Sequence, residues 1–326
     1  MNQRRKFLLT ASALAAAPLV SFAQPALNVR RIGILDTSNR QFLDTTFFVQ
    51  LRELGWTEGN NLAVDIRFSE GNNERLPQLA SELVQQKVEV IFTGGSPSSL
   101  EAARKATGTI PIVMAGGYSD NVRAGIIQSL ARPGGNITGA TFTSEELPGK
   151  RLQLLKEVVP RVSRVGNLAE ATPGESSQRD LTTEPARLLG LKMTNYFIRE
   201  PAEFEGTLRA ARKAKIDAFR VTGQPVFNRQ SGSRLAELLI KYWFPSMASW
   251  AHQADLGFLL AYGPAAGDIY RKAAVYVDKI LRGAKPADLP VEQPNQYYLV
   301  INLKTAKALG IKIPQSLLVR ADRVIE

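Results

Sequence analysis

The sequence contains no cysteine and only one histidine, His252. Without cysteine the chain has no disulfide bond, no thiolate nucleophile and no thiolate metal site. A metal site made from other ligands needs His, Asp and Glu residues clustered at ligand spacing, and the sequence offers no such cluster. It also lacks the Gly-x-Ser-x-Gly motif that a histidine-activated serine would need. These absences predict a protein that is not an enzyme and holds no metal.

Apolar stretches long enough to span a membrane are absent as well. The apolar segment at residues 7–20 is roughly half as long as a spanning helix, so a retained anchor is not expected. A basic segment, residues 4–6, precedes it, and a small-x-small pattern, residues 21–23, follows it. This order is typical of an export signal peptide over residues 1–23, cleaved near Ala23. Without a nearby cysteine the mature chain is expected to be a soluble protein and not a lipoprotein.

The Arg-Arg-x-Phe-Leu arrangement of residues 4–8 also resembles a twin-arginine signal, which carries folded proteins across the bacterial inner membrane. An ordinary secretory signal that happens to hold two arginines explains the same residues. Both alternatives place the mature chain in the periplasm.

The charge balance is basic, with 41 Lys and Arg residues against 30 Asp and Glu residues and a formal net charge of +11 at pH 7. Such basicity suggests a nucleic acid, a membrane surface or an anionic ligand as a partner. The basic residues are dispersed along the chain, and nucleic acid is a poor expectation for an exported protein. We therefore expect a solvated basic surface and no nucleic-acid or membrane partner.

Strand and helix patterns alternate from end to end, which is typical of parallel α/β architecture. Strand patterns cover residues 31–35, 62–68, 88–92, 110–114 and 137–142, and then residues 164–168, 192–198, 218–222, 245–249, 257–261 and 297–301. Helix patterns cover residues 42–54, 76–84, 145–159, 176–189, 203–215, 231–242 and 269–282, with a short helix ending at Gly310.

The pattern restarts after the fifth strand, which predicts two α/β lobes in series. Three prolines, Pro286, Pro290 and Pro294, indicate a segment that crosses between the lobes. We expect the first lobe to comprise residues 29–140 and 264–290, and the second to comprise residues 141–263 and 291–326.

Ligands of open parallel sheets bind beyond the carboxyl ends of the strands. Small and polar residues gather there, most clearly in the loop of residues 93–99, where glycines admit a close backbone approach. Unpaired N–H groups at the following helix and the hydroxyls of Ser96, Ser98 and Ser99 suit an anion such as a carboxylate. A turn whose serine caps its own helix explains the same residues. The loop matches neither the dinucleotide nor the phosphate-loop pattern, so no cofactor is expected.

Long segments spread over the mature chain resemble one known family. They are residues 51–60 (LRELGWTEGN), 129–139 (SLARPGGNITG), 149–156 (GKRLQLLK), 261–264 (AYGP), 276–294 (YVDKILRGAKPADLPVEQP) and 300–310 (VINLKTAKALG). These segments are similar to the ABC-transporter substrate-binding proteins of the tryptophan-receptor-like group. The resemblance implies an α/β fold of two Rossmann-like lobes with parallel sheets joined by a hinge, like type I periplasmic binding proteins. It also implies a small ligand held between the lobes, and no catalysis.

The resemblance implies a pocket lined by the loops at the strand ends. In the first lobe the expected ligand-binding residues are Thr37, Ser38, Gly95, Ser96, Ser98, Ser119 and Asp120. In the second lobe they are Glu170, Gln224, Trp250 and Tyr262. An isolated tryptophan is more often a core residue, but Trp250 follows a strand end and is therefore included.

The chain departs from the family pattern in the second lobe. After the first strand of the second lobe, relatives often have Trp-Asn-Pro, whereas this chain has Asn-Leu-Ala-Glu at residues 167–170. Relatives also often have Asp-Pro where this chain has Gln224-Pro225. An Arg-Glu pair is also common after the strand that here leads into residues 250–252. These positions would supply a partner for a ligand ammonium, a role that Glu170 or Asp120 can take instead. A carboxylate ligand without an amine stays open as an alternative.

These observations predict a periplasmic receptor of an ABC importer that binds a small carboxylate-bearing solute, such as an amino acid or a related organic acid. Its partners would be this solute and an inner-membrane ABC permease, and we expect a monomer. An extracytoplasmic sensor subunit for a membrane signalling kinase is the alternative, because both partners would read the closed form. An exported α/β enzyme is the third reading, against which the missing nucleophile motifs argue.

Overall fold

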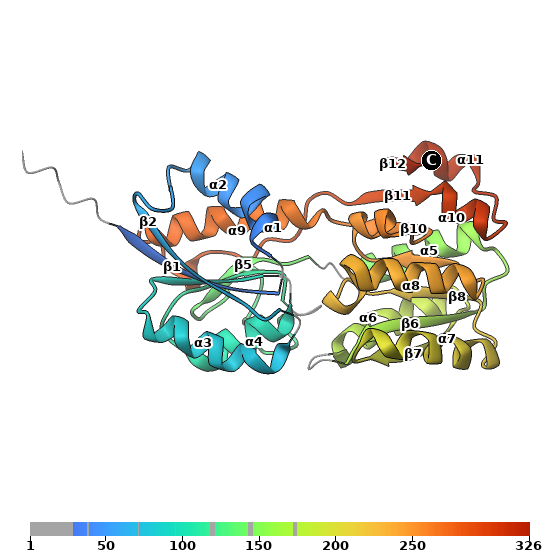
Figure 1. Ribbon diagram of the computed structural model, residues 1–326, viewed down its shortest axis with the longest axis horizontal. Coiled ribbons are helices and arrows are strands. Elements are labelled where there is room, and N and C mark those ends of the chain that lie inside the picture. Colours follow the sequence, from blue (N-terminus) through green and yellow to red (C-terminus); the bar gives the residue numbers. More distant parts are fainter. Residues whose placement is uncertain are drawn as a thin grey trace, which may run out of the picture.

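The computed structural model describes residues 29–326 except Ser38, Gly71, Gly95 and residues 118–120, 143–145 and 172–174. The predicted export segment lies outside the described residues. Two lobes lie side by side, and each is an open sheet covered by helices on both faces (Figure 1). This arrangement confirms the predicted fold class.

The first lobe holds a sheet of five strands in which every neighbouring pair is parallel. In spatial order they are β2 (Leu62–Phe68), β1 (Arg30–Asp36), β3 (Val90–Gly94), β4 (Ile112–Ala115) and β5 (Ile137–Ala140). One face packs on α1 (Arg40–Thr45), α2 (Phe47–Glu53) and α9 (Ala266–Leu281), and the other on α3 (Leu76–Gln85) and α4 (Pro97–Ala106). Alternate residues of β3 enter the two apolar clusters, as the period of a strand requires.

The helix predicted over residues 42–54 is divided into α1 and α2 at Thr46. The Thr46 hydroxyl donates a hydrogen bond of 2.6 Å to the carbonyl oxygen of Phe42, and its N–H reaches back only three residues to Leu43. Thr46 also lies against α9, where a Cβ added to Gly267 would be 3.2 Å from its methyl group. Thr46 thus lies both at the break and beside a helix more than two hundred residues away.

The second lobe holds a sheet of seven strands. In spatial order they are β12 (Arg323–Ile325), β11 (Tyr298–Asn302), β10 (Leu260–Gly263), β9 (Ser246–Ala248), β8 (Ala218–Val221), β6 (Arg164–Glu170) and β7 (Lys192–Ile198). All described pairs are parallel except β10 with β11, which are antiparallel. The sequence predicted β11 but neither its direction nor the last strand, β12.

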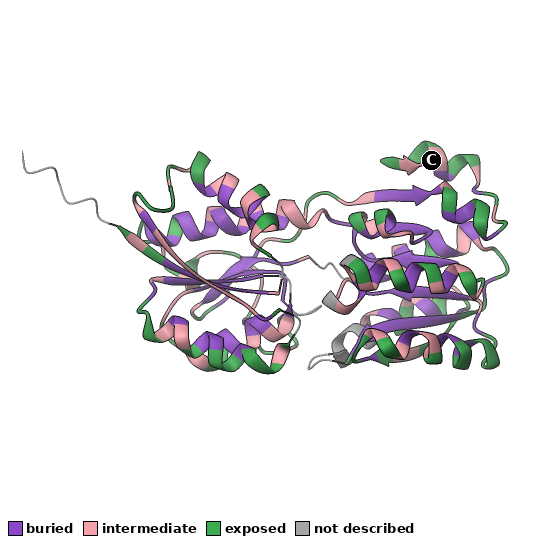
Figure 2. Ribbon diagram, viewed as in Figure 1, coloured by how far each residue is buried: buried purple, intermediate pink, exposed green. Residues whose placement is uncertain are grey.

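Helices cover both faces of the second sheet and enclose its buried residues (Figure 2). One face packs on α5 (Leu147–Val158), α6 (Glu175–Leu188), α10 (Leu303–Ala308) and α11 (Gln315–Arg320). The other packs on α7 (Phe204–Lys213), α8 (Arg229–Lys241) and the 3-10 turn η5 (Ala251–Leu256). Among the residues that the structure describes, no helix combines the length and apolarity needed to cross a bilayer.

The chain passes between the lobes after β5, after β10 and before β11. Before the last passage, Glu292 is tied to the first lobe at the end of β5. Its N–H donates to the carbonyl oxygen of Gly139 at 3.0 Å, and its own carbonyl oxygen accepts from the N–H of Thr141 at 2.8 Å. Its carboxylate accepts from Lys272 and from the Tyr276 hydroxyl of α9, each at 3.0 Å. Glu292 thus joins two of the passing segments to one helix.

Candidate ligand-binding site

Residues that follow strands in the two lobes meet at the boundary between the lobes. The ring centroids of Phe142, just after β5, and Trp250, just after β9, are 4.9 Å apart. The side-chain amide of Asn73 in the first lobe donates to the carboxylate of Glu170, at the end of β6, at 3.4 Å. The carboxyl ends of strands from both sheets therefore border the same region, as expected for the ligand site of an open α/β sheet.

The rings of Trp250 and Phe142 each lie directly against a glycine. The indole Nε1–H of Trp250 donates to the carbonyl oxygen of Gly223 at 2.9 Å, and Trp250 is only 7% exposed. A Cβ on Gly223 would lie 1.6 Å from that Nε1, and a Cβ on Gly116 would lie 2.4 Å from the Phe142 ring. Both positions need glycine because the aromatic rings approach the backbone so closely. Trp250 contacts the first-lobe core as well as its own lobe.

In the first lobe, the loop of residues 93–99 caps its helix and also leaves hydroxyl groups without partners. Ser96 is the N-cap of α4, and its Oγ accepts from the N–H of Ser98 at 3.1 Å. Thr93 Oγ1 and Ser99 Oγ are buried and have no hydrogen-bond partner within the described structure. Ser69, which follows β2, has a buried hydroxyl in the same situation. Buried polar atoms are normally paired, so these groups are available to a ligand or to water.

A buried carboxyl group lies at the end of β1, the neighbour of β3. Asp36 accepts a hydrogen bond of 3.3 Å from the hydroxyl of Tyr270 on α9. It lies so close to Gly94 that a Cβ there would be 2.0 Å from its Oδ2. Glycine at the end of β3 therefore allows an acidic side chain to occupy the edge of the sheet that borders the second lobe.

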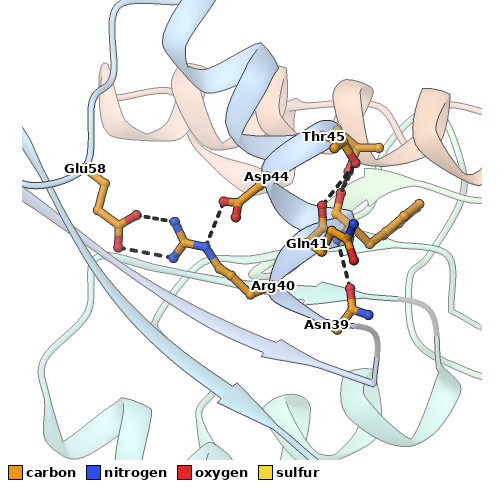
Figure 3. A network of polar contacts seen from close by, with 8 residues as sticks. Asn39, Arg40, Gln41, Asp44, Thr45 and Glu58 are labelled. Carbon is orange, nitrogen blue, oxygen red and sulfur yellow. Dashed lines mark hydrogen bonds and ion pairs between the residues drawn. The ribbon is translucent and has the colours of Figure 1, made fainter.

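A surface network fixes the start of α1, next to the predicted residue Thr37 (Figure 3). Asn39 caps the first turn of α1 with its side chain. The Arg40 guanidinium donates to Asp44 at 2.8 Å and to both carboxylate oxygens of Glu58 at 3.3 and 2.5 Å. The hydrogen bond that Arg40 donates to Glu58 is the main cause of the raised pKa of Arg40. Two acidic partners therefore hold Arg40 in place at the start of α1.

Glu170 is the charged residue of the second lobe at the lobe boundary. It is 9% exposed, its Oε1 accepts from Asn73, and its Oε2 is buried without a hydrogen-bond partner among the described residues. Burial raises the pKa of Glu170, and hydrogen bonds from the Val226 N–H and from Asn73 partly oppose that effect. A donor on a ligand, above all an ammonium group, would satisfy Oε2 and favour the charged carboxylate.

Gln224 and Gln253 hold the loops around Glu170 and Trp250. The side-chain Oε1 of Gln224 accepts from the N–H of Glu170 and from the Thr222 hydroxyl, each at 2.6 Å. The side-chain Oε1 of Gln253 accepts from the N–H groups of Ser249 and Trp250 at 3.0 and 2.9 Å. Both side chains therefore act through other residues, and Gln253 was not predicted.

Tyr262 is half-buried at the end of β10, with its ring 6.1 Å from that of Tyr297. Its carbonyl oxygen and that of Ser249 accept from the guanidinium of Arg151 on α5, at 2.7 and 2.8 Å. Arg151 thereby clamps the ends of β9 and β10. Sequence reasoning missed Arg151 because its position in α5 looks like that of an ordinary helix residue.

The structure brings Glu170, Gln224 and Trp250 together, and it places Thr37, Ser96, Ser98 and Tyr262 at strand or helix ends. Four predicted residues, Ser38, Gly95, Ser119 and Asp120, lie outside the described residues. Ser69, Asn73 and Phe142 were missed. Ser69 directly follows a predicted strand and was open to the same strand-end argument, whereas Asn73 and Phe142 carry no local signal. Within the described part of the chain, no cluster of three or more His, Asp or Glu residues is able to hold a metal ion.

The model of a family described as ABC transporter substrate binding protein matches residues 39–325. A tyrosine-binding protein of Clostridioides difficile is 27% identical over 290 residues, which cover 87% of this chain and 81% of the relative.

Two solved structures extend the comparison. The ABC domain from Streptococcus pneumonia in complex with L-Trp has a TM-score of 0.83 at 24% identity, covering 91% of this chain and 100% of that one. The ligand-free, open structure of a substrate binding protein from Clostridium difficile has a TM-score of 0.66 at 25% identity, covering 91% and 99%. Coverage and identity are thus nearly equal for the two structures, and the TM-scores differ.

Proposed function

This chain belongs to the family of ABC transporter substrate binding proteins, and we propose that it delivers a captured amino acid to an ABC permease of the inner membrane. Proteins of this family bind a substrate and act outside the cytoplasm. Membership also confirms that the chain is not an enzyme. We further propose the lobe boundaries, the periplasmic location, the cleavage near Ala23 and the monomeric state that the sequence predicts.

The unpartnered Oε2 of Glu170 is the observation that carries the choice of an amino acid. A buried carboxylate with a free oxygen suits an ammonium group, because charge-assisted hydrogen bonds are the strong ones. The ligand carboxylate is assigned to the loop of residues 93–99, where Thr93 and Ser99 have free hydroxyls. An aromatic side chain is favoured by the aromatic residues at the boundary, Phe142 and Trp250. Relatives that bind tyrosine or L-Trp support the same class.

The described arrangement of the lobes corresponds, in this proposal, to the closed state. Two contacts between the lobes support it, the aromatic pair and the hydrogen bond from Asn73 to Glu170. The greater likeness to a ligand complex than to an open, ligand-free relative supports it as well. Closure would then be a hinge motion about the passing segments, which presents a surface of both lobes to the permease.

The test is calorimetric titration of the mature protein with L-tyrosine, L-tryptophan and two matched analogues. One analogue of tyrosine lacks the amine, 3-(4-hydroxyphenyl)propionate, and the other lacks the carboxylate, tyramine. We expect an amino acid to bind and each analogue to bind at least about tenfold more weakly, because each leaves one buried group of the protein unpaired. Equal binding of the analogue without the amine would contradict the role of Glu170. Failure of all amino acids and small carboxylates to bind would contradict the ligand class.

A role as an extracytoplasmic sensor subunit stays the alternative, since a signalling kinase and a permease would both bind the closed form of the protein. Neighbouring genes for a permease and an ATPase favour transport, and a neighbouring kinase gene favours sensing. Replacing Arg4 and Arg5 by lysine tests the export route. Loss of export would identify the twin-arginine pathway, and unchanged export would leave the ordinary secretory one.

A further inference from the structure

Two arginines are buried inside the second lobe on the same face of its sheet. Arg220, in the middle of β8, is 3% exposed, and Arg151, on α5, is 5% exposed. Arg220 pairs in register with Met247 of β9, and Arg151 reaches the carbonyl oxygen of Ser249, two residues further along β9. Two residues of a strand span about 7 Å, so both cations lie in one small region between the sheet and α5.

Neither guanidinium has an acidic partner among the residues that the structure describes. Arg151 donates to two carbonyl oxygens, and Arg220 donates to the side-chain oxygen of Asn167 at 2.6 Å. Within the part of the chain that the structure describes, the Nε of Arg220 is buried without a hydrogen-bond partner. Asn167 in turn donates to Asn195 at 2.9 Å, so this polar row contains no negative charge.

Both groups stay charged at neutral pH in spite of their burial. Burial, and then the charge of Arg220, lower the pKa of Arg151 to about 9. Burial lowers the pKa of Arg220 to about 10. Two buried like charges that repel each other are costly unless an opposite charge compensates them, since each buried ion loses several kcal/mol of hydration, as an order of magnitude.

We propose that Arg151 and Arg220 form an anion-binding subsite in the second lobe, which accepts a carboxylate group or a small inorganic anion such as chloride. The free Nε of Arg220 supplies the donor, and the two cations supply the charge. The carbonyl oxygens that Arg151 binds belong to Ser249 and Tyr262, at the ends of β9 and β10, so the subsite lies near the edge of the sheet that borders the first lobe. These contacts define the subsite whatever solute the protein binds.

Thermal unfolding of the ligand-free mature protein in sodium bromide is the first test, with ionic strength held constant by a bulky sulfonate buffer. Bromide should raise the melting temperature in a saturable manner, by about 2–5 °C at twenty times its dissociation constant. Crystals soaked in bromide should show an anomalous-scattering peak beside both guanidinium groups. Absence of a saturable rise together with absence of the peak would overturn the proposal.

The variant Arg220→Met should lose the bromide response. It is expected to fold, because replacing an uncompensated buried charge by an apolar side chain of similar volume is often neutral or stabilising. The double variant Arg220→Met/Asn167→Leu also removes the amide that would be left unpaired, and it should behave identically. Arg187→Met is the matched control, because Arg187 is an exposed arginine of the same lobe, paired with Glu184, and this variant should keep the full response. A response that survives in the Arg220 variants would overturn the assignment.

A competition measurement identifies which anion occupies the subsite in the working protein. If the carboxylate of a bound solute enters it, the apparent solute Kd should rise with bromide concentration in the wild type and stay constant in Arg220→Met. If an inorganic anion occupies it, the solute Kd should not rise with bromide in either protein.

Discussion

The side-chain amide of Asn73 in the first lobe donates a hydrogen bond of 3.4 Å to the carboxylate of Glu170 in the second lobe. The bond joins the lobes at the acidic group that we assign to the ligand ammonium. Glu170 therefore has two functions in the proposal. Its Oε1 accepts the hydrogen bond from the first lobe, and its Oε2 accepts a hydrogen bond from the ligand ammonium.

Replacing Asn73 by alanine should weaken solute binding by about 2- to 12-fold, because the closed state loses one hydrogen bond worth roughly 0.5–1.5 kcal/mol. Calorimetric titration measures the effect. The melting temperature of the ligand-free protein should change little. Asn60→Ala, at an exposed turn of the same lobe, serves as the control and should bind like the wild type. Equal affinity of the Asn73 variant would show that the bond is not part of closure.

Replacing Glu170 by glutamine should stabilise the closed arrangement of the lobes at neutral pH in the absence of solute, and with it the folded protein. Burial raises the pKa of Glu170 in the folded state above its ordinary value of 4.5, so the charged form costs stability. The folded carboxyl takes up its proton at a higher pH than the unfolded one, and the penalty is fully relieved below pH 4.5. The gain in melting temperature of Glu170→Gln over wild type should therefore shrink as the pH falls from 8 towards 4.5.

Glu184, an exposed glutamate, has a pKa shifted in the opposite direction from that of Glu170. The hydrogen bond from Arg187 lowers the pKa of Glu184, so its contribution is present above pH 4.5 and is lost on acidification. Glu184→Gln should be slightly destabilising at neutral pH, and the difference from wild type should vanish at lower pH. A Glu170 variant that follows the Glu184 pattern would contradict the buried, incompletely paired carboxylate.

Trp250 should report closure by its fluorescence. Trp56 donates to Asp278 within the first lobe, and Trp243 is 60% exposed, so neither depends on the lobe boundary. In the double variant Trp56→Phe/Trp243→Phe, solute binding should shift the remaining emission to the blue. Adding Phe142→Leu should reduce that shift and weaken binding by about 2- to 12-fold, the value of one aromatic pair. An unchanged spectrum on saturation would contradict the movement of Trp250.

Alanine at Gly223 should impair both folding stability and binding, because its Cβ would displace the Trp250 ring. We expect a loss of about 1–3 kcal/mol in the free energy of unfolding and at least tenfold weaker binding. Urea unfolding and calorimetry check the two effects. Gly206→Ala, in the interior of α7 with open space around it, should instead stabilise by about 0.5–1 kcal/mol. Similar behaviour of the two variants would contradict the close approach of Trp250.

Local sequence patterns correctly predicted the helices and strands whose bounds are set by neighbouring residues in the chain. The bounds of β2 and β7 agree with prediction to the residue, and the buried positions of α3 are those of its apolar stripe. The division of α1 from α2 was missed because the apolar residues Leu43, Phe47 and Leu51 keep helical spacing across the break. The direction of β11 was missed because an alternating strand pattern is the same in either direction.

The residues of the site also fall into those that the sequence predicted and those that only the folded chain shows. Glu170, Gln224 and Trp250 were found because they follow strands and because the family resemblance pointed to those positions. Arg151 and Arg220 were not found, since a basic residue within a helix or strand normally faces solvent. The burial of Arg151 follows from the packing of α5 on β9 and β10, and that of Arg220 from its central place in the second sheet, which only the folded chain shows.

Neither lobe is formed by a continuous stretch of chain, and this has a consequence for biosynthesis. Helix α9, which covers β3, β4 and β5, follows nearly the whole second lobe, and β11 and β12 follow α9. A ribosome that adds about 5–20 residues per second needs roughly 10–50 s to proceed from the export signal to the end of α9. Throughout that interval the nascent chain would carry the predicted export signal while the part of the first sheet that α9 covers is still exposed. A secretory translocase would receive an unfolded chain that needs no unfoldase, whereas a twin-arginine translocase would have to wait until roughly the last fifth of the protein has been made.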